Sequence, residues 1–210
     1  MIESNRLELF IASSVCVGLA LLCFRLYRSN LALRQQIGKA QQDHYDARHD
    51  ELTGLMNRRG WAERIHGMIK LEQTPSEMFL AMLDIDQFKR INDQHGHLVG
   101  DRILEEFSNR LKSAFSDQDR YTLTRIGGEE FTILACEPFE EFHKKLQQLL
   151  DSLNNQAFIL PNASITIGCS IGVAAFDSTE LPDRWIARAD RALYRSKRLG
   201  GNQICLGEPS

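Results

Sequence analysis

Two short acidic motifs carry residue types that can bind a metal ion and a phosphate. Asp84-Ile85-Asp86 follows the apolar run 79–83, and Gly127-Gly128-Glu129-Glu130 lies between two segments of alternating polarity. A continuous apolar run is typical of a strand buried on both faces, and a carboxylate at its end is costly unless it reaches solvent or a cation. If the two strands are neighbours in one sheet, Asp84 meets Glu129. Two carboxylates with a backbone carbonyl predict a Mg²⁺ site completed by water and substrate phosphates.

Residues near these motifs extend the predicted chemistry to nucleotides. Such a metal site serves phosphoryl and nucleotidyl transfer. Lys89 lies about one helical turn beyond the strand end, within reach of a developing negative charge. Asn92 and Asp101 offer a carboxamide and a carboxylate, and a carboxylate can accept hydrogen bonds from the edge of a guanine. Because the sequence has no P-loop motif, phosphates must be held by metal, backbone amides and scattered cations.

The glycine pair predicts a hairpin. Both flanks alternate as strands do, and we expect Gly127 and Gly128 to take positive φ in a tight turn. An ordinary exposed hairpin, with acids for solubility, is the alternative that these few residues leave open. The sequence alone assigns no role to Glu130 or Asp86.

The periodicity of the rest of the chain predicts an α+β fold. Helices are expected after Asn57, from about Gly100, and over residues 139–153 and 182–199. Residues 164–176 are expected to form one or two strands interrupted by glycines, and residues 204–206 an edge strand. This order predicts a mostly antiparallel sheet covered by helices, in a domain over residues 49–210.

The N-terminal residues predict a membrane anchor. The sixteen residues 9–24 carry no charge, and as a helix they would span roughly 24 Å. We therefore expect a transmembrane helix over about residues 9–27, within an anchor of residues 1–28. Basic residues follow it, which predicts a single-pass protein of a bacterial inner membrane with its N-terminus outside and its domain in the cytoplasm. A cleaved signal peptide is the alternative, although its charged leading region would be poor.

Residues 29–48 predict a helical, coiled-coil-like linker. Leu26, Asn30, Leu33 and Ile37 recur at heptad spacing, which favours a parallel dimer, and a solitary amphipathic helix is the alternative. The net charge of −3 gives no indication of general nucleic-acid binding. The five cysteines form no C-x-x-C pair, so they are interpreted as reduced thiols.

Several separated motifs together resemble the GGDEF family of diguanylate cyclases over residues 48–206. These motifs are Asp50-x-Leu52-Thr53-Gly54-Leu55-x-Asn57-Arg58-Arg59, Asp84-x-Asp86-x-Phe88-Lys89-x-Ile91-Asn92-Asp93, His97, Gly100-Asp101, Arg125-x-Gly127-Gly128-Glu129-Glu130-Phe131, Ser170-Ile171-Gly172-Val173 and Ala189-Asp190-x-Ala192-Leu193-Tyr194-x-x-Lys197. The resemblance implies a palm-like fold related to nucleotide cyclases and polymerases. It also implies that two GTP molecules are condensed into cyclic di-GMP and two pyrophosphates, with Mg²⁺ or Mn²⁺ as cofactor.

The resemblance also implies roles for individual residues. Asp84, Glu129 and the carbonyl of Ile85 would bind the metal, and Glu129 would also be the base toward the 3′-hydroxyl. Lys89 would be the cation at the transition state. The remaining residues would bind substrate: Asn92, His97 and Asp101 the guanosine, and Lys197 a phosphate.

The product joins two guanylates through two bonds, so the resemblance implies a homodimer. Two departures from the family pattern stand out. Gly201 stands where the family often has a phosphate-binding Arg, and residues 118–121 lack the Arg-x-x-Asp motif of the inhibitory product site. We therefore expect no product inhibition through that site. The alternative function is an inactive GGDEF domain that binds GTP or cyclic di-GMP or acts as a scaffold at the membrane; the sequence does not identify an upstream signalling partner.

Overall fold

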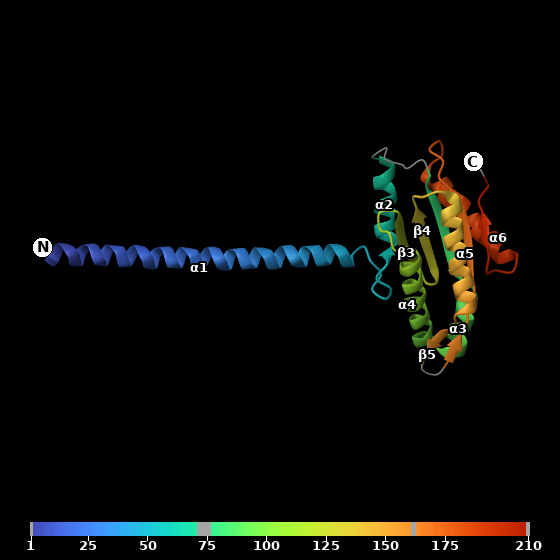
Figure 1. The fold of residues 1–210 in the computed structure, drawn as a ribbon, viewed down its shortest axis with the longest axis horizontal. Helices are drawn as coiled ribbons and strands as arrows, with labels where there is room; N and C mark the ends of the chain where they lie inside the picture. Colours follow the sequence, from blue (N-terminus) through green and yellow to red (C-terminus); the bar gives the residue numbers. More distant parts are fainter. Residues whose placement is uncertain (1, 71–76, 161–162, 209–210) are drawn as a thin grey trace. The chain divides into compact units, whose positions relative to one another are not determined.

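The chain of 210 residues is described by a computed structural model over residues 2–70, 77–160 and 163–208 (Figure 1). Side chains are described for residues 21–67, 77–159 and 164–208. The chain divides into two compact units, residues 1–46 and residues 47–210, and each is described by itself.

The first unit is one helix, α1 (Ile2–Asp46), with no break between the expected anchor and the expected linker. In the part of the chain whose side chains are described, no helix is long and apolar enough to cross a membrane. The transmembrane helix expected at residues 9–27, and the single-pass inner-membrane location that depended on it, are wrong by this finding. From residue 21 onward α1 has only a short apolar stretch before Arg25 and Arg28, and residues 9–20 of the expected span lie outside the described side chains.

The second unit is built on a six-stranded sheet with the order β1-β3-β4-β2-β7-β8. The strands are β1 (Met56–Asn57), β2 (Phe79–Ile85), β3 (Tyr121–Gly127), β4 (Glu130–Ala135), β7 (Cys169–Ala175) and β8 (Ile204–Leu206). The pairs β3–β4, β4–β2 and β2–β7 are antiparallel, whereas the edge pairs β1–β3 and β7–β8 are parallel. The mostly antiparallel α+β sheet predicted from the sequence is confirmed.

Helices cover both faces of this sheet (Figure 1). They are α2 (Arg58–Lys70), α3 (Phe88–His95), α4 (His97–Ala114), α5 (Phe139–Asn155) and α6 (Pro182–Arg198). Odd-numbered residues of β2, such as Leu83, share a core with α4 and α5. Even-numbered ones, such as Met82, share a second core with α2 and α6. Because successive strand residues point to opposite faces, the apolar run of β2 supplies both cores.

Gly172 in β7 lets α6 lie directly on the sheet. A Cβ at this position would be 2.1 Å from the backbone nitrogen of Leu193 and 2.3 Å from the backbone oxygen of Ala189. Only a residue without a side chain permits this approach. The position of α6, and of every residue that it carries toward the end of β2, therefore depends on this glycine.

Several local expectations are confirmed and others are wrong. The helix expected after Asn57 is confirmed as α2, and Asn57 caps it: the amide of Gly60 donates a hydrogen bond to Oδ1 of Asn57 at 3.0 Å. The helix expected from about Gly100 begins earlier, at His97, because Gly96 adopts φ of 85° and starts it. Positive φ at Gly127 and Gly128 is wrong: within the described residues it occurs at other glycines. The sequence did not predict β1 or β5 (Phe158–Leu160). The strands expected within residues 164–176 correspond to β6 (Ala163–Ile165), which pairs with β5 in a separate two-stranded sheet, and to β7.

Candidate active site

A row of polar side chains crosses the sheet where β2 ends. In the antiparallel register, Asp84 of β2 pairs with Glu130 of β4 on one side and with Ser170 of β7 on the other. Directly paired residues of neighbouring strands point to the same face of a sheet. Asp84 is two residues beyond Met82 and four beyond Leu80 on the same strand, so its side chain points to the same face of the sheet. This is the face covered by α2 and α6.

Glu129 lies beside the same strand end. Its backbone carbonyl accepts a hydrogen bond from the amide of Ile85 at 3.3 Å, so the glycine hairpin is tied to the end of β2. Burial raises the pKa of the Asp84 carboxyl above its usual range, and the nearby negative charges of Glu129 and Glu130 raise it further. The structure thus brings three carboxylates together at one end of the sheet, including the pair predicted from the sequence.

Lys197 supplies the positive charge at this strand end. Its Nζ lies 2.7 Å from Oδ2 of Asp84, whose side chain is only 9% exposed. Lys197 reaches this position from the last turn of α6, which Gly172 allows to lie close to the sheet. One ammonium group therefore faces three carboxylates, and the site retains an excess of negative charge.

The donor groups at this strand end fit a hard divalent cation. Within the described ranges, no group of three or more His, Cys, Asp or Glu side chains has the geometry to hold a metal ion by itself. Mg²⁺ in proteins usually has one or two carboxylate ligands and takes its other ligands from water and substrate phosphates. Asp84 with Glu129 or Glu130, and the backbone carbonyl of Ile85, match that kind of site, and the excess negative charge favours a cation there.

The four other predicted site residues lie on α3 and α4. Asn92 packs against Gly100, where a Cβ would be only 1.9 Å from Oδ1 of Asn92. That oxygen is buried and has no hydrogen-bond partner among the described residues. The side chains of Lys89, His97 and Asp101 are exposed. The structure thus brings Asn92 and the start of α4 together, but within the described part of the chain no hydrogen bond or ion pair joins these residues to Asp84.

Arg125 of β3 holds the glycine turn in place. Its Nε donates to the backbone oxygen of Gly128 at 2.9 Å, and its Nη1 donates to Asp50 at 3.0 and 3.1 Å. Burial alone would raise the pKa of Asp50, but hydrogen bonds from Thr53 and Arg125 outweigh it and hold that pKa below its usual value. The Asp50 and glycine-turn motifs, far apart in the sequence, thus form one support of the site.

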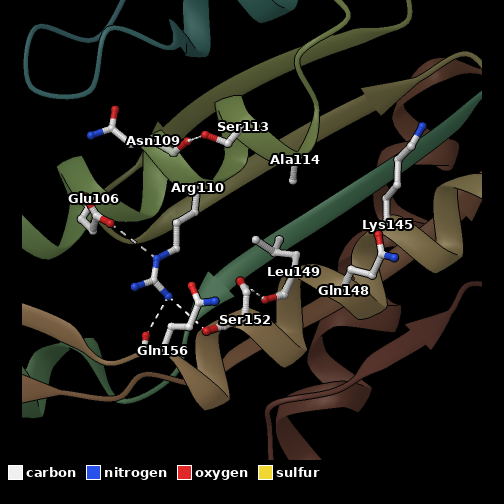
Figure 2. Close-up of a pocket in the computed structure, with 10 residues that line it drawn as sticks. All are labelled: Glu106, Asn109, Arg110, Ser113, Ala114, Lys145, Gln148, Leu149, Ser152 and Gln156. Carbon is white, nitrogen blue, oxygen red and sulfur yellow. Dashed lines mark hydrogen bonds and ion pairs between the residues drawn. The ribbon is translucent and has the colours of Figure 1, made fainter.

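A cavity of about 490 Å³ lies elsewhere, between α4 and α5 (Figure 2). Arg110 lines this cavity and points toward the end of α5, where it donates hydrogen bonds to the backbone oxygens of Ser152 and Gln156 at 3.2 and 2.8 Å. The guanidinium also lies 4.0 Å from the centre of the Phe158 ring. These contacts satisfy the last carbonyls of a helix. We therefore interpret this cavity as a groove between packed helices and place the chemistry at Asp84.

Sequence reasoning missed Glu130, the residue that pairs with Asp84. The signal was present in the alternation of β4. Phe131, Ile133 and Ala135 belong to the α4–α5 core, so the side chain of Glu130 must point to the opposite face of the sheet. The register between β2 and β4 was needed to place it beside Asp84, and no pattern in a single strand provides that register.

A mostly antiparallel sheet with helices on both faces, and with acids at the end of a central strand, defines a palm-like α+β domain. Residues 47–203 match the family described as "Diguanylate cyclase, GGDEF domain". The chain belongs to this family.

Relatives and solved structures agree with this assignment. Diguanylate cyclase DgcP of Pseudomonas aeruginosa is 35% identical over 177 residues, which cover 81% of this chain and 26% of DgcP. Diguanylate cyclase VdcA of Vibrio cholerae is 34% identical over 176 residues, which cover 82% of this chain and 50% of VdcA. This chain therefore spans half or less of the length of these curated relatives. The crystal structure of the coiled coil and GGDEF domain of DgcB from Caulobacter crescentus, in complex with c-di-GMP, has a TM-score of 0.81 at 26% identity and covers 89% of this chain and 99% of that one.

Proposed function

We propose that this protein is a diguanylate cyclase, which condenses two GTP molecules into cyclic di-GMP and two pyrophosphates. The observation that carries the proposal is the pairing of Asp84 with Glu130 at the end of β2, opposite Lys197. Membership of the GGDEF family and the named cyclases among the relatives support it.

The acids of this strand end are the groups that would hold a divalent ion, Mg²⁺ or Mn²⁺. Asp84, the carbonyl of Ile85, and the carboxylates of Glu129 and Glu130 are available for it. When bound, such an ion neutralises charge on the reacting phosphates. Glu129 is the proposed base that takes the proton of the 3′-hydroxyl.

The basic and amide side chains are proposed to bind the nucleotide. Lys197 leaves Asp84 to contact a phosphate, and Lys89 contacts the charge that develops in the transition state. Asn92, His97 and Asp101 contact the guanosine. The buried Oδ1 of Asn92, which has no partner among the described residues, supports a polar ligand at that position.

The reaction requires two copies of the chain. Each 3′-oxygen forms a bond to the α-phosphorus of the other GTP, the bond from that phosphorus to the β-phosphate oxygen breaks, and pyrophosphate leaves. One domain carries one such site, so two domains must face each other across a two-fold axis. Exposed apolar residues at heptad spacing on α1, Leu26, Leu33 and Ile37, support dimerisation through that helix.

The direct test is to incubate the purified full-length protein with GTP and Mg²⁺ and to identify the product by mass spectrometry. We expect cyclic di-GMP from the wild type and none from Asp84→Asn. If the wild type binds GTP in calorimetry but makes no product, the alternative of an inactive nucleotide-binding domain is correct instead.

Changing both Leu33 and Ile37 to Asp should abolish dimerisation and lower the rate of cyclic di-GMP synthesis. If both the dimerisation and the rate stay at the wild-type level, α1 is not the dimer contact.

We also propose that the enzyme lacks product inhibition through the Arg-x-x-Asp site. In the described structure, the matching residue Tyr121 interacts with Lys145, which also contacts Glu137 at 2.7 Å. These side chains are engaged with one another. Potent inhibition of the purified enzyme by low concentrations of cyclic di-GMP would contradict this.

A further inference from the structure

Asp86 is the second acid of the first motif, and both of its oxygens are engaged. Oδ1 accepts a hydrogen bond from Oγ of Ser170 at 2.7 Å, and Oδ2 accepts one from the backbone amide of Asn202 at 2.7 Å. The amide of Asp86 donates to the carbonyl of Gly168 at 3.0 Å. One carboxylate thus joins the end of β2, the start of β7 and the segment that follows α6.

The backbone around Asp86 is shaped to admit this carboxylate. Gly201 adopts φ of +77°, and a Cβ there would be 2.8 Å from Oδ2 of Asp86. A Cβ at Gly168 would be 2.9 Å from the same oxygen. An L-residue at position 201 would be both strained and in collision with Asp86. In this conformation, the Arg that the family often has at position 201 would be strained and would require the Asp86 carboxylate or the backbone to shift.

The segment bound by Asp86 is the one that ends α6. The amide of Gly200 donates to the carbonyl of Lys197 at 3.2 Å, and the amide of Gly201 donates to the carbonyl of Ser196 at 3.0 Å. These bonds satisfy the last carbonyls of the helix. The carboxylate of Asp86 is therefore connected, through two backbone segments, to the turn of α6 that carries Lys197.

We propose that Asp86 is a positioning residue: it holds the end of α6 at the end of β2 and so sets where Lys197 can reach Asp84 and the substrate phosphates. This inference rests on the proposed function. A role as metal ligand would require Asp86 to give up the hydrogen bonds from Ser170 and Asn202, whereas among the described residues the carboxylate of Asp84 has the ion pair with Lys197 to release.

The test is a double-mutant cycle of Asp86→Asn and Lys197→Met on the full-length protein. Affinity for a non-hydrolysable GTP analogue is measured by calorimetry, and affinity for Mn²⁺ alone by electron paramagnetic resonance. We expect each single variant to bind the GTP analogue about tenfold more weakly than the wild type does, which is the effect of losing one hydrogen bond to a charged group. If Asp86 acts through Lys197, the double variant should bind the analogue no more weakly than Lys197→Met alone. Asp86→Asn should leave Mn²⁺ affinity within about threefold of wild type, while Asp84→Asn lowers it by about tenfold or more.

Three outcomes would overturn the inference: a loss of Mn²⁺ affinity in Asp86→Asn equal to that in Asp84→Asn, effects of Asp86→Asn and Lys197→Met that multiply, or no effect of Asp86→Asn. Asp183→Asn, the same change at an exposed position in the first turn of α6, is the matched control and should bind the GTP analogue as the wild type does.

If Asp86→Asn does not fold, Ser170→Ala can replace it in the cycle, because it removes one hydrogen-bond donor to the Asp86 carboxylate. Its effect on analogue binding should likewise not add to that of Lys197→Met. Neither binding measurement needs product formation, so a wild type without cyclase activity would refute the proposed function and leave this cycle interpretable.

Discussion

Two acid–lysine pairs with the same separation occupy different parts of the sheet unit. Lys197 lies 2.7 Å from Asp84, and Lys145 lies 2.7 Å from Glu137. Around Glu137, the further partners are donors: Arg120 at 3.9 Å, and Tyr121, which contacts Lys145. Around Asp84, the further groups are the acids Glu129 and Glu130.

The two pairs differ in the charges that surround the acid, and from this difference we derive different expectations for them. At Glu137 the side chain is 0% exposed, and two cations, Lys145 at 2.7 Å and Arg120 at 3.9 Å, lie close to its Oε2. At Asp84 the nearby groups include two further acids and one ammonium, which is why we propose that a divalent ion replaces Lys197 there and frees it for a phosphate. We therefore expect the first pair to stabilise the junction of β4 and α5, and we propose that the second pair serves binding and chemistry.

The largest expected effect is on the Asp84 pair. Asp84→Asn should lower cyclic di-GMP synthesis by about a thousandfold or more, at least as much as loss of a single electrostatic contact to a transition state. Its thermal stability without metal should not fall, because a carboxylate is removed from a group of like charges. The rise in Tm that Mg²⁺ produces in the wild type should disappear. A Mg²⁺-dependent rise that persists in Asp84→Asn would show that the metal binds elsewhere.

The Glu137 pair should respond in the opposite way. Lys145→Met leaves Glu137 buried without its ammonium and should cost about 3 kcal/mol, the low end for a buried pair because Lys145 is 32% exposed. Urea denaturation measures this loss, and the activity of the folded protein should stay near wild type. The double variant Glu137→Leu with Lys145→Met should recover much of the stability. If Lys145→Met abolishes activity in fully folded protein, the division between a structural and a functional pair is wrong.

The sequence contained enough information to predict that the Asp84 strand and the glycine hairpin meet. The apolar run of β2 indicated a central strand, and the alternation in β3 and β4 indicated a hairpin beside it. The partner of Asp84 was not predictable in the same way. Glu130 is placed by the register of β2 on β4, and neither strand alone specifies that register. The adjoining β3–β4 hairpin also contains an irregularity between Arg125 and Gly127.

The contacts of Asp86 and the second Lys–Glu pair were also beyond the sequence patterns. Ser170 and Asn202 are 84 and 116 residues from Asp86, and neither spacing nor periodicity relates them. Glu137 lies two residues after the end of β4, and its position in the sequence is that of an ordinary charged residue before a helix. Long-range polar contacts of this kind depend on how complete elements pack, whereas hydrophobic periodicity reports on one element at a time.

A shift of α6, the helix that carries Lys197, should affect the Asp84 pair. Gly172→Ala should force α6 away from β7, lowering stability by about 1 to 3 kcal/mol or more and also weakening binding of the GTP analogue, because Lys197 moves with the helix. Gly67→Ala is the matched control, since a Cβ at this position of α2 meets nothing within 4 Å. It should raise stability by about 0.5 to 1 kcal/mol without changing nucleotide binding. Unchanged nucleotide affinity in a folded Gly172→Ala protein would contradict the dependence of Lys197 on this contact.

The smallest expected effect concerns Asp50, which supports the glycine turn through Arg125 and belongs to neither pair. Because the pKa of Asp50 is lowered in the folded state, its contribution to stability is present above its unfolded value of 3.8 and is lost as the pH falls through the lower folded value. Asp50→Asn should therefore be less stable than the wild type at pH 6. This gap, the difference in the free energy of unfolding between the two proteins, should narrow at pH values below 3.8. Urea denaturation at a series of pH values measures this gap, and a constant gap down to pH 2 would mean that Asp50 acts through packing instead of charge. The Glu137 pair does not contact Asp50, so Lys145→Met should leave this narrowing unchanged.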